Sequence, residues 1–157
     1  MPLLAALLFA TQAACPTPAP LPRALSPWAQ PTAITASTAS GQRFPVLAIG
    51  RAYSARLAPA GSLKWVRKPG KAGAADLFGG LLAFDVPVEG TYLVGLSGPG
   101  WIDVLERGQR VPSASHAHGP TCSGIRKLVG FRLRPGRHVL QIAGLPERSA
   151  TVMVVRE

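Results

Sequence analysis

The chain of 157 residues contains no asparagine, two cysteines and seven acidic residues. Without asparagine there is no N-glycosylation sequon, and no apolar run reaches the about 20 residues that a transmembrane helix needs. No serine lies in a G-x-S-x-G context, and Asp76, Asp85 and Glu89 show no calcium-loop spacing. Asp103 and Glu106 are three apart on an expected strand, so they face opposite sides and make a poor acid–base pair.

With seven acidic residues against 17 basic ones, the net charge is +10. The basic residues are scattered, and neither an RNP-like aromatic motif nor a helix-turn-helix pattern accompanies them. Charge of this kind supports only a sequence-independent attraction to anionic partners. We therefore expect no specific nucleic-acid binding, and we expect an exported protein of this charge to meet anionic components of the cell envelope.

The N-terminus, MPLLAALLFATQAAC, places an apolar run before small residues and a cysteine. This order is typical of a secretory signal peptide with an A-x-A-like cleavage region. We predict that residues 1–14 are removed on export and that the mature chain is periplasmic or secreted. Gln12-Ala13-Ala14-Cys15 faintly resembles a lipobox, although Gln12 stands where a Leu-like residue is usual, so lipid anchoring at Cys15 is the lesser alternative.

Residues 15–41 are rich in Pro, Ala, Ser and Thr and contain one aromatic residue, Trp28. Such composition with little periodicity predicts an extended, linker-like arm, of which Trp28 is the residue suited to tuck into the domain. The length of the chain suits one domain, which we place at residues 42–157.

Short runs in which apolar and polar residues alternate, bounded by Gly or Pro, fill residues 42–157. This pattern is typical of half-buried strands, and no window shows a helical apolar stripe. The expected strands are 53–57, 63–65, 82–86, 91–96, 101–105, 129–133, 139–142 and 151–155. Glu89-Gly90, Arg107-Gly108 and Pro135-Gly136 are expected to turn hairpins. We predict an all-β fold: a monomeric, antiparallel, jelly-roll-like β-sandwich.

The segment SHAHGPTCSG, residues 115–124, concentrates the reactive side chains, and the sequence leaves three interpretations of it open. In the first, His116 and His118 lie on one face of an extended backbone and, with a Cys122 thiolate, bind Cu or Zn. A fourth ligand must then come from elsewhere: His138, Asp103 or Met153.

The second interpretation is a disulfide. Export leads to an oxidising compartment, where the two cysteines, Cys15 and Cys122, form the simplest pairing. The bond would close a loop of about a hundred residues, worth roughly 4–5 kcal/mol in the chain-entropy model. It would also pin the arm to the sandwich and leave no thiolate for a metal. The third interpretation is a polar loop without chemistry.

The second half of the chain carries four short motifs, W-[IV]-D-V, H-x-H-G-P-x-C, I-R-K and L-x-P-G, and Cys15-Pro16 precedes them. In these motifs the chain resembles a group of small exported proteins of alphaproteobacteria, notably sphingomonads. The resemblance covers most of the chain, is densest from Phe78 to the end, and implies a disulfide between the two cysteines. The motif positions supply the candidate binding residues: Trp101, Asp103, Arg126 and Lys127.

Members of this group often carry the name homogentisate 1,2-dioxygenase, which implies an iron cofactor. His116-x-His118 and Pro135-Gly136-x-His138 resemble the two cupin motifs in order, but Cys122 stands where the glutamate ligand is expected. A facial triad then lacks its carboxylate. We therefore expect no cofactor and a non-enzymatic binding or envelope-associated module. The alternative is a metal-dependent protein, dioxygenase-like, with Fe, Cu or Zn.

Overall fold

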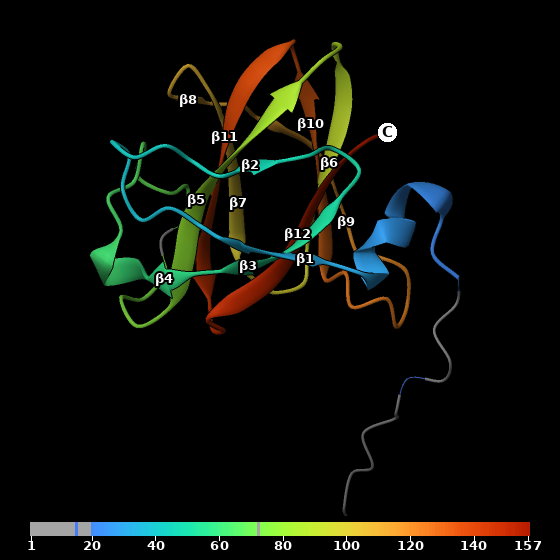
Figure 1. Cartoon of the computed structure of the whole chain (residues 1–157), viewed down its shortest axis with the longest axis horizontal. Coiled ribbons are helices and arrows are strands. Elements are labelled where there is room, and N and C mark those ends of the chain that lie inside the picture. The colour runs from blue at the N-terminus through green and yellow to red at the C-terminus, as the bar shows by residue number, and fades with distance from the viewer. Residues whose placement is uncertain (1–14, 16–19, 72) are drawn as a thin grey trace, which may run out of the picture.

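Two mixed β-sheets pack face to face in the computed structural model, which describes Cys15, residues 20–71 and residues 73–157 (Figure 1). The expected all-β sandwich is thus confirmed. The first sheet has the strand order β1-β3-β12-β6-β10-β9, and the second has the order β2-β5-β11-β7-β8, with β4 also paired to β5. The predicted signal peptide, residues 1–14, lies outside the described residues, and of the lipobox-like sequence only Cys15 is described.

The strands are β1 (Thr32–Thr35), β2 (Val46–Leu47), β3 (Ala52–Arg56), β4 (Ala58–Pro59), β5 (Phe78–Val86), β6 (Gly90–Leu96), β7 (Trp101–Glu106), β8 (Gln109–Arg110), β9 (Ser113–Ala117), β10 (Lys127–Leu133), β11 (Gly136–Leu145) and β12 (Ser149–Arg156). Two short 3-10 helices accompany them, η1 (Arg23–Ala29) and η2 (Ala60–Ser62). The strand expected at 63–65 is wrong, because Lys64 makes only an isolated bridge to Ala39.

The sheets are not purely antiparallel as predicted. β1 runs parallel to β3, and β2 runs parallel to β5. A parallel pair needs a connection that returns the chain to the same end of the sheet. The segment between β1 and β3 does this by passing through β2, which lies in the other sheet.

Two of the turns predicted to close hairpins instead carry the chain from one sheet to the other. Glu89-Gly90 leads from β5 in the second sheet to β6 in the first, and Pro135-Gly136 leads from β10 in the first sheet to β11 in the second. Since β5 pairs with β11 and β6 pairs with β10, the two crossings lie side by side. Only Arg107-Gly108 closes a predicted hairpin, β7–β8, with φ of 49° and 75° as a two-residue type I′ turn requires.

Strand β12 is apolar on both faces. Val152 and Val154 belong to the core between the sheets, whereas Met153 and Val155 lie on the outer face of the first sheet. Helix η1 covers this outer face with Leu25 and Trp28, both buried. β12 therefore needs cover from the N-terminal segment as well as from the second sheet.

The segment predicted as a linker-like arm is therefore partly a component of the domain. Trp28 is 7% exposed and tucks into the outer face of the first sheet, where its ring would lie 3.3 Å from a Cβ placed on Gly95. Strand β1 then adds an edge to the same sheet. The domain thus begins before residue 42, because the apolar outer face of the first sheet requires this cover.

We predict that Trp28→Ala lowers the free energy of unfolding by about 3–5 kcal/mol, because it removes a large buried side chain from between η1 and the sheet. Urea denaturation of the oxidised protein measures this loss. Trp28→Phe keeps most of the buried ring and should cost clearly less. A loss below about 1 kcal/mol for the alanine variant would contradict the packing of η1 on the sheet.

Candidate functional site

The SHAHGPTCSG segment is expected from the sequence to be a loop, but it is only partly one. Its first residues belong to the exposed edge strand β9. His116 Nε2 lies 2.8 Å from Ser113 Oγ, and His118 Nδ1 lies 3.1 Å from the carbonyl oxygen of Arg126. A carbonyl oxygen only accepts, so Nδ1 of His118 is the donor. Each histidine ring is therefore held by a hydrogen bond to a nearby residue.

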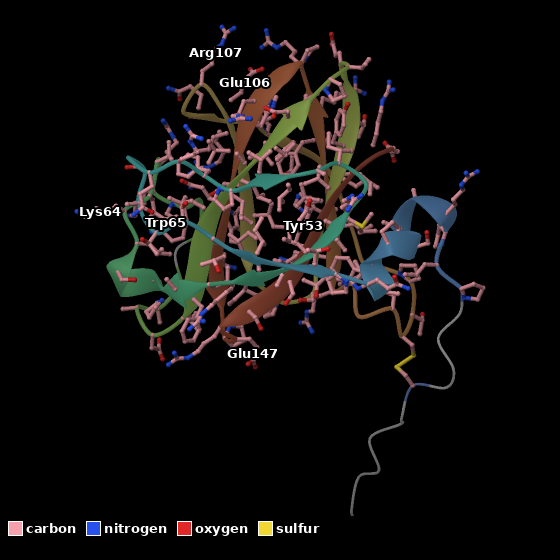
Figure 2. The ribbon with its side chains drawn as sticks, in the orientation of Figure 1. Tyr53, Lys64, Trp65, Glu106, Arg107 and Glu147 are labelled. Carbon is pink, nitrogen blue, oxygen red and sulfur yellow. A yellow bond between two sulfur atoms is a disulfide. The ribbon has the colours of Figure 1, made fainter. Side chains whose placement is uncertain are left out.

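A disulfide joins Cys15 to Cys122, with the Cα atoms 5.6 Å apart and 107 positions between the two residues in sequence (Figure 2). Of the three interpretations of the segment, the structure thus contains the cysteine pairing. Cys122 sits at a φ of 59° in the connection between β9 and β10, and the bond ties Cys15 to that connection. Cys122 as a thiolate ligand is therefore a wrong prediction, because its sulfur is bonded to Cys15.

Among the described residues, the predicted metal ligands are not gathered into one cluster. No group of three or more His, Cys, Asp or Glu side chains suited to a metal ion occurs within Cys15, residues 20–71 and residues 73–157. Met153 is buried in the cluster beside Trp28, and His138 is 1% exposed on β11 of the second sheet. The donor set that these residues offer does not fit an Fe, Cu or Zn centre.

A cavity of about 310 Å³ opens between the β7–β8 edge of the second sheet and the β9–β10 edge of the first. Its polar walls include Trp101, Arg110, His116 and Lys127. The indole of Trp101 is 36% exposed, although most large apolar residues here are buried. The structure thus brings together three predicted binding residues, Trp101, Asp103 and Lys127, and a predicted metal ligand, His116.

Asp103 holds the aromatic and basic walls of this cavity in place. It is 2% exposed, its Oδ1 accepts the Trp101 Nε1–H at 3.0 Å and lies 2.8 Å from Arg110 Nε, and its Oδ2 accepts the Gly70 N–H at 2.9 Å. A buried carboxylate is tolerated only with such partners. Asp103, predicted as a binding residue, is therefore a positioning residue for Trp101 and Arg110.

Gln141, which pairs with Asp103 across β11 and β7, fixes the loop that covers the outer face of the second sheet. Its Oε1 accepts the N–H groups of Val66 and Arg67 at 3.0 and 3.2 Å, and its Nε2 donates to the Arg67 carbonyl at 2.8 Å. The same loop carries Trp65, labelled in Figure 2. We did not predict from the sequence that Gln141 holds this loop. A single Gln within an otherwise apolar strand could have indicated it.

Lys127 reaches from β10 toward the start of β7, where its Nζ donates to the Gly100 carbonyl at 2.6 Å. Partial burial lowers the pKa of Lys127, and the charges of Arg126 and Lys71 lower it further. Arg126 itself is exposed and is not one of the described residues that line the cavity. Of the predicted I-R-K residues, only the lysine therefore belongs to this site.

No family model and no curated protein sequence matches the chain. Within the described part of the chain, no helix is both long and apolar enough to cross a membrane.

We predict that reduction of the disulfide lowers the free energy of unfolding by about 4–5 kcal/mol, since a loop of 107 positions is released in the unfolded chain. Urea denaturation of the oxidised and of the reduced, alkylated protein measures the difference, and a Cys15→Ser/Cys122→Ser variant should match the reduced form. An intact mass after alkylation in denaturing, non-reducing conditions should show no added label. Two alkylated thiols in the oxidised protein would contradict the bond.

We predict that Asp103→Asn destabilises the protein by about 2–3 kcal/mol, because the new amide NH₂ faces N–H donors and Arg110 loses its counter-charge. Asp85→Asn is the matched control: Asp85 is 54% exposed in a surface pair with Arg137 and should cost less than about 1 kcal/mol. Thermal or urea unfolding measures both variants. Equal losses in the free energy of unfolding would contradict the larger contribution to stability that we expect from the buried Asp103.

Proposed function

We propose that the protein is an exported, non-enzymatic binding module that holds an anionic polysaccharide of the cell envelope in the cavity between β7–β8 and β9–β10. One observation carries this proposal. The accessible indole of Trp101 is fixed by the buried Asp103 beside two cationic side chains, Arg110 and Lys127.

The chemistry of these groups suits an acidic sugar chain. The indole offers a flat apolar face to a sugar ring, and its N–H is already used by Asp103, so the face is the part left for a ligand. Guanidinium and ammonium groups donate charge-assisted hydrogen bonds to carboxylate or phosphate oxygens. Because Trp101 and Arg110 are held before a ligand arrives, less conformational entropy is lost on binding.

The rest of the chain supports the same class of ligand and the same compartment. A net charge of +10 attracts polyanions at a distance. The disulfide is compatible with an oxidising compartment, and the N-terminus has the order of a signal peptide. We therefore place the mature protein in the periplasm or outside the cell.

Binding of polygalacturonate oligomers, measured by calorimetry at low and moderate salt, tests the proposal. We expect saturable binding that weakens with salt, because the contacts are partly ionic, and much weaker binding of neutral dextran. Trp101→Ala should weaken the affinity about tenfold, which is the size of effect that removal of a central aromatic contact has.

A pair of lysine variants separates the site from the general charge. Lys127→Met should weaken binding several-fold, whereas Lys64→Met, on the loop labelled in Figure 2 and away from the cavity, should leave it unchanged. Equal losses in the two variants, or full binding by Trp101→Ala, would show that polyanions bind by net charge and would overturn the proposed site.

A further inference from the structure

A second cavity, of about 320 Å³, opens where the β7–β8 hairpin meets the crossing from β10 to β11. It adjoins the cavity of Trp101, with which it shares three lining residues: Arg110, Val111 and Pro112. Glu106, at the end of β7, lines it at the upper end of the molecule as drawn in Figure 2. The two cavities are thus neighbours, and together they are called the groove.

A buried histidine lines this second cavity with one ring nitrogen unpaired. His138 is 1% exposed, and its Nδ1 lies 3.1 Å from the Gly136 carbonyl oxygen, which only accepts, so Nδ1 carries the proton. In the neutral ring Nε2 then offers a lone pair. Within the described residues Nε2 has no hydrogen-bond partner, whereas most buried polar atoms in folded proteins have one.

A carboxylate oxygen, a second acceptor, lies close to this nitrogen. Glu106 Oε1 lies 3.8 Å from His138 Nε2, beyond hydrogen-bond distance, and the other carboxylate oxygen is 3.5 Å from Arg134. With the His138 ring neutral, both Nε2 and Glu106 Oε1 are acceptors on residues that line the cavity, and a hydroxyl-bearing ligand would supply donors to both.

The surrounding charges decide what else the ligand carries. Three arginines line the cavity, Arg110, Arg132 and Arg134, and their guanidinium groups oppose a divalent cation at His138 and Glu106. They favour an acidic group close to the hydroxyls. A guanidinium binds a carboxylate or a phosphate with two parallel hydrogen bonds, and a uronate is the sugar unit that carries its carboxylate beside hydroxyls.

We propose that this cavity, the His138 pocket, binds one uronate unit of the acidic polysaccharide. One hydroxyl donates to His138 Nε2, a neighbouring hydroxyl donates to the Glu106 carboxylate, and the uronate carboxylate accepts from Arg132 or Arg134. The inference rests on the proposed function, of which it names the recognised unit.

Three small probes test the two halves of this recognition. D-glucuronate carries hydroxyls and a carboxylate, D-glucose lacks the carboxylate, and glutarate lacks the hydroxyls. We expect D-glucuronate to bind at least about tenfold more tightly than either of the others in calorimetry or ligand-observed NMR. Its binding should also move the nitrogen resonance of His138 Nε2, as a new hydrogen bond at that atom requires. Equal affinities for the three probes, or an unmoved Nε2 resonance, would overturn the inference.

Two variants connect that binding to the pocket. Glu106→Gln keeps the size of the side chain but places an amide donor opposite His138, and His138→Leu removes the unpaired nitrogen; each should weaken D-glucuronate at least about tenfold. Glu147→Gln, at the opposite end of the molecule in Figure 2, is the matched control and should bind as the parent does. Glu106 is partly exposed, so its variant should fold even where His138→Leu does not.

The outcomes separate this inference from the proposed function. If Trp101→Ala abolishes polygalacturonate binding while Glu106→Gln and His138→Leu leave both ligands unaffected, the His138 pocket is overturned and the proposed function stands. If Glu106→Gln abolishes D-glucuronate binding, but the polymer binds no more tightly than the monomer and ignores Trp101→Ala, the pocket stands and the polymer-binding function is overturned.

Discussion

The chain passes repeatedly between the two sheets, and these crossings tie their apolar inner faces together around one core. Consecutive strands mostly lie in different sheets, and β4–β5, β7–β8 and β9–β10 are the sequential pairs that remain neighbours among the described strands. This connectivity leaves β8 and β9 at adjacent edges of opposite sheets. The inner-face residues Ile102, Val129 and Phe131 line the cavity there, so the groove follows from the way in which the sandwich is closed.

The two sheets cover their outer faces by different chemistry, and the difference creates the site. The first sheet uses apolar contacts, with Trp28 packed beside Met153 and Val155. The second sheet uses buried polar groups, since Gln141 and its register partner Asp103 hold backbone groups of the covering loop. Because Asp103 has further acceptor capacity, the same carboxylate also orients a tryptophan and an arginine toward the groove.

Local patterns predicted the strands better than their partners. The short apolar runs at 82–86 and 151–155 correctly located β5 and β12, because runs of this length bounded by turn residues are typical of strands. Such runs could not tell a hairpin from a crossing at Pro135-Gly136, since both need the same turn residues. Trp101 and Lys127 were found through motif positions, but the contact of Glu106 with His138 was not, because it arises only when β7 pairs with β11.

The few acidic residues explain why the groove is left cationic. Three of the seven carboxylate side chains, all on strands of the second sheet, are paired with arginines. Asp85 pairs with Arg137, Asp103 with Arg110, and Glu106 with Arg134. The Arg137 guanidinium also lowers the pKa of Asp85. These three carboxylates are thus paired with arginines, whereas Lys127, among the described residues, donates to neutral carbonyls. An anionic ligand would balance the positive charge that remains in the groove. In the proposed His138 pocket, that ligand would also supply a hydrogen-bond donor to the unpaired ring nitrogen.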